Sequence, residues 1–183
     1  MSKIYLIRHG LTEANEKHLY CGSTDLPLSQ KGREELAETK YDIDKSKVCF
    51  ITSGMKRTEE TLKILFGDIP HVIDIRFKEI DFGIFEMKSY NELKDTAEYQ
   101  QWLDGDNHTN IPPQGESGTQ MEKRVLVAFA EIKGTDKDTV IITHGGVIAS
   151  IMANLFKEEN KNRYQWQPKQ GHGYLIENDK YYI

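Results

Sequence analysis

The alternation of short apolar runs with longer helical patterns is the feature that most constrains how this chain can fold. Four β-branched runs predict strands, over residues 3–7, 48–52, 71–75 and 139–143. Continuous apolar runs of this kind are typical of strands that are buried on both faces of a parallel sheet. A fifth run, over residues 173–178, predicts one more strand at an edge of the sheet.

Helical patterns fill the intervals between these runs. They predict helices over residues 29–39, 54–65, 118–132 and 145–156. Ser29 is a suitable N-cap for the first helix, and Gly67 follows the end of the second. The alternation predicts an α/β fold, a three-layer α/β/α sandwich with a mostly parallel central sheet. A length of 183 residues suits one domain over residues 1–183, with a lid-like segment around residues 85–115.

Composition excludes several classes of partner. The formal net charge of −5 disfavours non-specific binding to nucleic acid or to an anionic membrane. The chain has no apolar run long enough for a membrane span and no leader for secretion. The two cysteines lack metal or redox spacing, which indicates a reduced, cytoplasmic location. The six histidines and two cysteines form no metal-ligand cluster, so we expect no metal or other cofactor.

Two similar tripeptides follow two of the predicted strands. "RHG" (residues 8–10) ends the first apolar run, and "HGG" (residues 144–146) follows the fourth. In sheets of this class, ligands bind at the carboxyl ends of the strands. We therefore expect His9 and His144 to lie side by side at that edge.

Positive charge gathers at the same edge. A helix that starts at Gly145 presents free backbone N–H groups there, an arrangement that suits an anion. Arg57, in the first turns of the second helix, can reach the edge where Arg8 lies. Two arginines, two histidines and a helix N-terminus predict a binding site for a phosphate-like dianion.

Six segments, in this order, make the chain resemble the histidine phosphatase superfamily, also called phosphoglycerate mutase-like. They are "LIRHGLTEAN" (6–15), "PLSQKG" (27–32), "TSGMKRTEET" (52–61), "FKEIDFGIFEM" (77–87), "PPQGES" (112–117) and "VIITHGGVIASIM" (140–152). Together they are far more specific than any one of them.

The resemblance implies a role for each matching position. His9 becomes the nucleophile that is transiently phosphorylated, and Glu79 donates the proton to the leaving oxygen and later activates water. The side chains implied to hold the phosphoryl oxygens are Arg8, Arg57, Asn15 and His144. Gly10 and Gly145 shape the backbone around the pocket, and Cys21 and Gly22 lie near it as substrate-binding positions. Nearby arginines disfavour an imidazolium, as a histidine nucleophile requires.

Several assignments have competing interpretations at the level of sequence. Asp81 and Glu86 are rivals of Glu79 as the acid. Glu116 and Ser117 could belong to the site or simply start a helix. A thiol nucleophile at Cys21 is disfavoured because no base is paired with it. The aromatic residues of the middle region either stack on a base or pack the lid; they are Phe82, Phe85, Tyr90, Tyr99 and Trp102.

Mutases and phosphatases of this superfamily share the same site residues. Only about 35 residues separate Glu79 from Gly115, and a short lid admits water, which favours hydrolysis. The segments "LYCGSTDLPLSQKG", "FGIFEM", "YNEL" and "EYQQWLDGDNHTNIPPQGES" resemble the α-ribazole phosphatases of cobalamin synthesis. The resemblance thus implies a metal-independent phosphomonoesterase acting on a small phosphate ester such as α-ribazole 5′-phosphate. The alternatives are a cofactor-dependent phosphoglycerate mutase and a broad-specificity sugar-phosphate phosphatase. A homodimer is left open as the oligomeric state.

Overall fold

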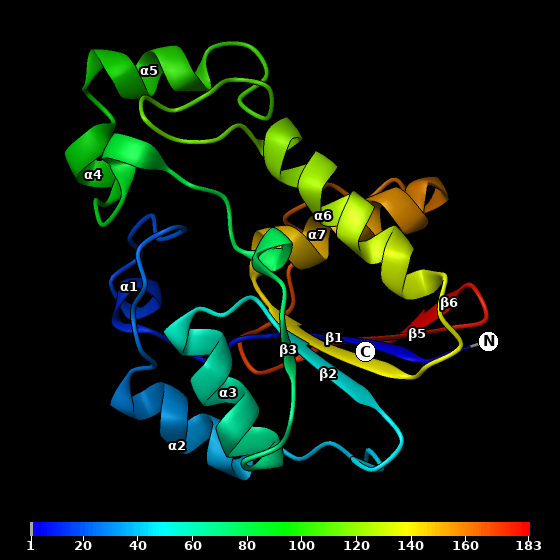
Figure 1. The fold of residues 1–183 in the computed structure, drawn as a ribbon. Helices are drawn as coiled ribbons and strands as arrows, with labels where there is room; N and C mark the ends of the chain where they lie inside the picture. The colour runs from blue at the N-terminus through cyan, green and yellow to red at the C-terminus, as the bar shows by residue number, and fades with distance from the viewer. Residues whose placement is uncertain (1) are drawn as a thin grey trace.

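A six-stranded sheet forms the middle of three layers in the computed structural model, which describes residues 2–183 (Figure 1). The strand order is β3-β2-β4-β1-β5-β6. The strands are β1 (Ile4–Arg8), β2 (Cys49–Thr52), β3 (Val72–Ile73), β4 (Thr139–Thr143), β5 (Gly173–Glu177) and β6 (Lys180–Tyr182). Strands β1 to β4 are parallel to one another, β5 is antiparallel to β1, and β6 is antiparallel to β5. The predicted mostly parallel α/β/α sandwich is therefore confirmed.

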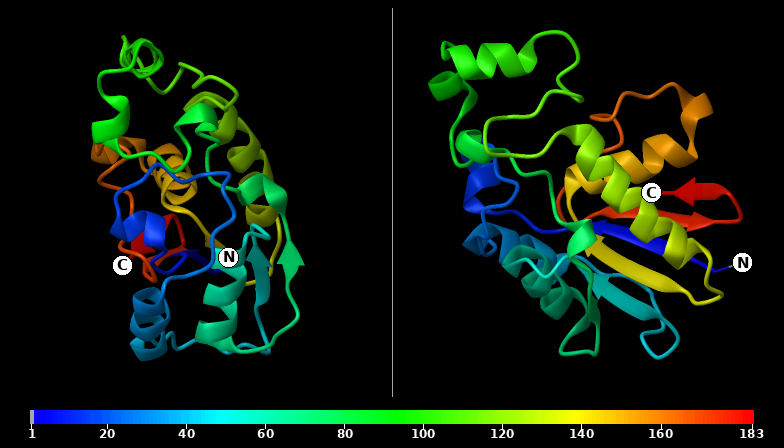
Figure 2. Two further views of the ribbon diagram at one scale, coloured as in Figure 1. Left: turned by 90° about the vertical axis from the view of Figure 1, so that its left-hand side faces the viewer. Right: turned by 45° about the horizontal axis from the view of Figure 1, so that its top comes forward.

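Four longer helices cover the two faces of the sheet (Figures 1 and 2). Helices α2 (Gln30–Glu38) and α3 (Lys56–Phe66) lie on one face, and α6 (Gly118–Lys133) and α7 (Gly145–Leu155) lie on the other. Ser29 caps α2 by accepting from the Gly32 N–H, and Gly67 ends α3 at a φ of 88°, as the sequence predicts. Shorter elements are α1 (Glu13–Glu16), α4 (Tyr90–Leu93), α5 (Ala97–Leu103) and the 3₁₀ helices η1 (Ile75–Phe77), η2 (Gly83–Phe85) and η3 (Lys157–Glu159).

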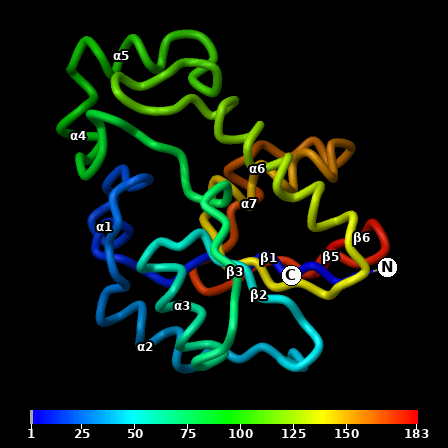
Figure 3. Tube along the Cα trace, viewed as in Figure 1, coloured from blue at the N-terminus to red at the C-terminus, as the bar shows by residue number. Residues whose placement is uncertain are grey.

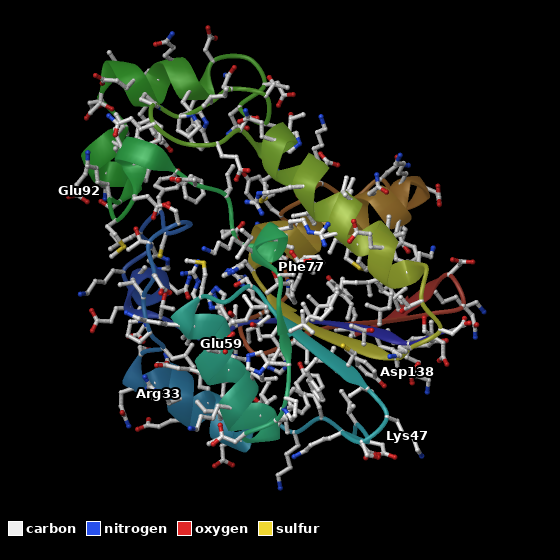
Figure 4. All side chains as sticks on the ribbon, viewed as in Figure 1. Arg33, Lys47, Glu59, Phe77, Glu92 and Asp138 are labelled. Atoms are coloured by element: carbon white, nitrogen blue, oxygen red, sulfur yellow. The ribbon has the colours of Figure 1, made fainter. Side chains whose placement is uncertain are left out.

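The core is densest where β4 lies between the helical layers. All five residues of β4 are buried, as continuous apolar runs in a central parallel strand require. Ile141 packs in the cluster that faces α6 and α7, whereas Ile142 packs in the cluster that faces α3. Phe77, which is fully buried and labelled in Figure 4, belongs to the first cluster and lies at the end of η1.

Two of the predicted strands differ from the structure. Residues 71–75 form only the two-residue edge strand β3, whose Val72 and Ile73 are 53% and 58% exposed. The strand stops there because the Asp74 side chain accepts from the Arg76 N–H and caps η1. The strand over residues 173–177 is not at an edge, since β6 pairs with it across a turn in which Asn178 and Asp179 both have positive φ.

The segment of residues 85–115, which contains α4 and α5, extends beyond the sandwich on the side of α1 (Figure 3). It has a small core of its own, made of Phe85, Leu93, Tyr99 and Trp102. It is attached to the chain before α2 through the Leu19–Ser89 bridge and the Tyr20 N–H, which donates to the Lys88 carbonyl. Within residues 2–183, no helix combines the length and the apolar character that a bilayer span needs.

A matched pair of substitutions tests this burial pattern. Ile142→Ala should lower the free energy of unfolding by about 2–5 kcal/mol, because it removes methyl groups from a fully buried site. Ile73→Ala should cost less than about 1 kcal/mol, because that side chain is mostly in solvent. Urea unfolding followed by circular dichroism measures both. Equal losses would contradict the assignment of β3 as an exposed edge strand.

Candidate active site

The parallel register of β1 and β4 brings the two histidines together. Arg8 pairs with Thr143, so the next residues, His9 and His144, leave the sheet side by side. The His9 N–H still donates to the Thr143 carbonyl at 2.9 Å. The two imidazole rings meet edge to face with centroids 5.2 Å apart. The predicted proximity of the two rings is therefore confirmed.

A hydrogen bond sets the tautomer of His9. Its Nδ1 lies 2.7 Å from the carbonyl oxygen of Gly10. Because a carbonyl oxygen can only accept, Nδ1 carries the proton and Nε2 keeps a free lone pair. The ring is 5% exposed, so this lone pair belongs to a nearly buried, neutral imidazole.

His144 is fully buried and has protein partners at both ring nitrogens. Its Nδ1 accepts from Arg57 Nε at 3.2 Å, so its Nε2 carries the proton and donates to Ser53 Oγ at 2.9 Å. Arg57 is 1% exposed, and its other guanidinium nitrogens donate to the carbonyls of Thr24 and Gly22 at 2.8 and 2.7 Å. Two of the five N–H groups of Arg57 thus have no partner among residues 2–183.

Both imidazoles are strongly biased toward the neutral form. Burial is the main reason that the pKa of His9 lies well below its ordinary value, and the charges of Arg57 and Arg8 lower this pKa further. Burial likewise lowers the pKa of His144, with Arg57 the next largest cause. The sequence predicts the effect of the arginines, but burial makes the larger contribution.

A cavity of about 530 Å³ opens in front of this edge. Arg8 and Asn15 line it on the sheet side. The Arg8 Nε–H is buried and has no hydrogen-bond partner within residues 2–183, and Nη1 donates to the Pro168 carbonyl at 2.9 Å. The Asn15 carbonyl oxygen accepts from the backbone and hydroxyl of Thr12, which leaves its amide NH₂ available to a ligand. His9 and His144 do not themselves line the cavity; His9 directly follows Arg8 in the chain, and His144 is two residues before Gly146, which lines it.

Three carboxylates compete for the role of the acid, and geometry separates them. Glu79 lines the cavity; one of its oxygens accepts from the Gly146 N–H at 2.9 Å and the other from its own neighbour Ile80 at 3.0 Å. Asp81 accepts from Gly83 and from a serine hydroxyl outside the cavity. Glu86 is occupied by N–H and O–H donors. Among residues 2–183, Glu79 is therefore the only carboxylate lining the cavity.

Glu86 organises the loop that holds Arg57. Its two oxygens accept from the backbone N–H groups of Gly22, Ser23, Thr24 and Phe82 and from the Thr24 hydroxyl. The carbonyls of Gly22 and Thr24 in turn receive the Arg57 guanidinium. Gly22 therefore contributes its backbone to the support of Arg57. Cys21 lines the cavity, but burial raises the pKa of its thiol, which disfavours the thiolate.

Glycines allow close approaches around the site. A Cβ on Gly10 would lie 2.5 Å from a Leu36 methyl group, and one on Gly145 would lie 2.9 Å from the Arg8 guanidinium carbon. A Cβ on Gly146 would lie 2.4 Å from a Glu79 carboxylate oxygen. The N-terminus of α7 thus already holds an anion, the Glu79 carboxylate, whereas the sequence predicts free N–H groups there.

Three residues with a part in the site are absent from the sequence prediction. They are Gly146, Ser53 and Arg124; Arg124 contacts the Glu79 backbone. Gly146 is part of the "HGG" tripeptide, a signal that could have identified it, whereas nothing in the sequence indicates what Ser53 or Arg124 contact. Ser117 caps α6 in a capping box with Gln120, so it starts a helix. Across residues 2–183, no group of three or more metal-ligating side chains is arranged around a common point.

The lowered pKa of His9 predicts a pH-dependent stability. The unfolded ring takes up a proton near pH 6.5, whereas the folded ring resists protonation, so acid favours unfolding. The free energy of unfolding should therefore fall between pH 7 and pH 5. His9→Asn, which keeps an N–H donor for Gly10, should reduce that slope by at most about 1.4 kcal/mol per pH unit. Urea titrations at several pH values measure the slope, and parallel lines for the two proteins would contradict the assignment.

Comparisons with known proteins agree with this geometry. The family model described as histidine phosphatase superfamily (branch 1) matches residues 4–181. The chain is 26% identical over 182 residues to the adenosylcobalamin/alpha-ribazole phosphatase of Escherichia coli (strain K12), covering 92% of this chain and 86% of that protein. It is 27% identical over 165 residues to a protein of Enterobacter sp. (strain 638) named "Probable phosphoglycerate mutase GpmB", covering 85% and 75%.

The crystal structure of the alpha-ribazole phosphatase from Shigella flexneri superposes with a TM-score of 0.83 at 25% identity, covering 98% of this chain and 93% of the other. The motifs, the paired histidines and the family model therefore agree that this chain belongs to branch 1 of the histidine phosphatase superfamily, a group of phosphatases and mutases that act on phosphate esters.

Proposed function

We propose that this protein is a phosphomonoesterase that needs no metal ion and works through a phosphohistidine at His9. The observation that carries the proposal is the hydrogen bond from His9 Nδ1 to the Gly10 carbonyl at 2.7 Å. It leaves Nε2 unprotonated, and burial keeps the ring neutral. An imidazole prepared in this way is a nucleophile for a phosphoryl group.

In the first step, His9 Nε2 attacks phosphorus while the bond from phosphorus to the ester oxygen breaks. Arg8, Arg57, His144 and the Asn15 amide hold the phosphoryl oxygens in this proposal, which requires the His144 Nε2–H to exchange its bond to Ser53 Oγ for one to the substrate. The Arg8 Nε–H and two N–H groups of Arg57 have no protein partner in the described chain, so they are available to oxygens of the substrate. These cationic donors stabilise the charge that is spread over the phosphoryl oxygens in the transition state.

Glu79 supplies the proton in this proposal. Its protonated carboxyl transfers a proton to the leaving oxygen, and the phosphoryl group remains on His9. Water then attacks phosphorus, the Glu79 carboxylate takes the proton from that water, and the bond between phosphorus and His9 Nε2 breaks to release inorganic phosphate.

The cavity suits a leaving group that carries an aromatic base, and we propose α-ribazole 5′-phosphate, an alkyl ester of this kind, as the substrate. Six aromatic side chains line the cavity, namely Tyr20, Phe82, Tyr90, Tyr99, Trp102 and Tyr164. Phe85 does not line the cavity, and Tyr99 and Trp102, which do, also pack in the small core of the 85–115 segment. The relative from Escherichia coli named for alpha-ribazole supports the same choice.

A phosphoglycerate mutase or a sugar-phosphate phosphatase is the second candidate, and one observation favours an acidic substrate. Arg163 lines the same cavity and, in the described chain, forms no ion pair with a carboxylate. Its guanidinium donates instead to Asn107 and contacts His108. A carboxylate of the substrate, as in phosphoglycerate, could be bound by this guanidinium.

A substrate panel separates the candidates. In the presence of EDTA, phosphate release should proceed at its full rate, with the highest kcat/KM for α-ribazole 5′-phosphate, a lower value for sugar phosphates and the lowest for 3-phosphoglycerate. Vanadate and inorganic phosphate should compete with the substrate. A loss of activity in EDTA that Mg²⁺ or Zn²⁺ restores would contradict the proposed chemistry. Net isomerisation of phosphoglycerate without phosphate release would favour the mutase.

Glu79→Gln tests the acid. Glutamine keeps the shape but can neither donate nor accept the proton, and general acid catalysis is worth about 10²–10⁴-fold. The kcat/KM for an alkyl phosphate should fall by this full factor. The kcat/KM for nitrophenyl phosphate should fall much less, because its leaving group is stable as an anion. Phosphohistidine should accumulate, because the same residue activates water. Asp81→Asn is the control, and its change in kcat/KM should be the same for both substrates. An equal loss for both substrates in Glu79→Gln would contradict the role of Glu79 as the acid.

A further inference from the structure

Arg124, on α6, uses every N–H donor of its guanidinium. Nε and Nη2 donate to the two carboxylate oxygens of Glu116 at 2.8 and 2.7 Å. Nη1 donates to the carbonyls of Arg76 and Lys78, both at 2.7 Å, and Nη2 also donates to the carbonyl of Glu79 at 3.1 Å. These five contacts match the five donors that an arginine has. Lysine cannot reproduce them, because its ammonium is a point charge with three donors.

The three carbonyls belong to the segment that carries the carboxyl assigned as the acid. Residues 76–79 leave η1 and run to the edge of the cavity. From the opposite side, the Thr143 hydroxyl donates to the Phe77 carbonyl at 2.7 Å. The backbone of this segment is therefore held between α6 and β4. The Gly146 N–H then holds the carboxylate itself.

Glu116, the carboxylate partner of Arg124, is also hydrogen-bonded to the chain where the 85–115 segment begins and ends. Its N–H donates to the Asp81 carbonyl at 2.9 Å, and the Ile84 N–H donates to the Pro113 carbonyl at 3.0 Å. The chain entering the segment is thus hydrogen-bonded to the chain leaving it. The Glu116–Arg124 pair connects this base to the backbone at Glu79.

The pair contacts the backbone around the acid but does not reach the cavity at Arg8. Arg124 and Glu116 line a separate hollow on the other side of Glu79. Their side chains are 25% and 21% exposed and are joined by two parallel hydrogen bonds, so the ion pair fixes the orientation of the guanidinium as well as pairing two charges. Its geometric effect on the backbone at Glu79 is the larger consequence, since a displacement of about 1 Å in a reacting group can cost about 10²-fold in rate.

We propose that Arg124 and Glu116 are positioning residues that hold Glu79 in place for proton transfer to the leaving group. The proposal rests on the proposed role of Glu79 as the acid. It assigns a function to two side chains that touch neither the phosphoryl group nor the leaving group. It also makes proton transfer sensitive to the attachment of the 85–115 segment.

Arg124→Lys is the main experiment, with kcat/KM measured for an alkyl phosphate and for nitrophenyl phosphate. The alkyl phosphate should lose about 10- to 100-fold, and nitrophenyl phosphate less than about 3-fold, because only the first needs a well-placed acid. Glu116→Gln, which removes the charge but keeps one acceptor, should show the same selectivity with a smaller loss. Arg33→Lys is the matched control. Arg33 donates to Glu60 from α2, on the other face of the sheet (Figure 4), and both substrates should stay within about 2-fold of wild type.

A double variant isolates the route of the effect. Adding Arg124→Lys to Glu79→Gln should cause no further loss on the alkyl phosphate, because a residue that acts through Glu79 has nothing left to position. Equal losses on both substrates, or additive losses in the double variant, would overturn the positioning role. Glu116→Gln carries the same test if Arg124→Lys does not fold. A Glu79→Gln variant with no dependence on the leaving group would instead refute the role of Glu79 as the acid, a separate result in the same assay.

Discussion

The parallel pairing of β1 with β4 is the interaction on which the rest of the site depends. It pairs Arg8 with Thr143 and continues for one more hydrogen bond, from the His9 N–H to the Thr143 carbonyl. Because side chains alternate along a strand, a shift of one residue in this register would turn each side chain to the other face. The histidines would then no longer meet. The buried side chains of β4, clamped between helices on both faces, prevent such a shift.

The site gathers positive charge without neutralising it. Arg57 is almost fully buried but is bound by carbonyls and by an imidazole nitrogen, and no carboxylate pairs with it in the described chain. Burying a charge on neutral partners is costly unless its donors are satisfied. Glu86 reduces that cost indirectly, because it organises the loop whose carbonyls bind Arg57. The negative charge that would complete the site is thereby left to the ligand.

The sequence predicts the central layers and the paired histidines well, because both depend on local patterns. The apolar runs at 139–143 and 3–7 identify the central strands, and the residues after them must reach the same edge. The errors have equally physical causes. The run at 71–75 looks like a buried strand, but no rule of composition shows that Asp74 caps a 3₁₀ helix and leaves Val72 in solvent.

The contacts of long polar side chains could not be predicted from the sequence. Arg124 lies in a helical pattern where an arginine normally faces water, and its partners come from segments 8 to 48 residues away. Such contacts depend on the final packing of the helices on the sheet. The sequence can therefore identify the two histidines, since these follow strand ends, but not the side chains whose contacts form only in the final packing.

Glu79 combines a contact at a strand end with a contact that arises from helix packing. Its carboxylate accepts the N–H of Gly146 at the start of α7, and its backbone is held by Arg124. In the proposed mechanism, these two contacts hold both the carboxyl and the backbone of the residue that gives its proton to the leaving oxygen. Cleavage of a poor leaving group requires such a fixed donor, because proton transfer depends on the distance between the carboxyl and the leaving oxygen.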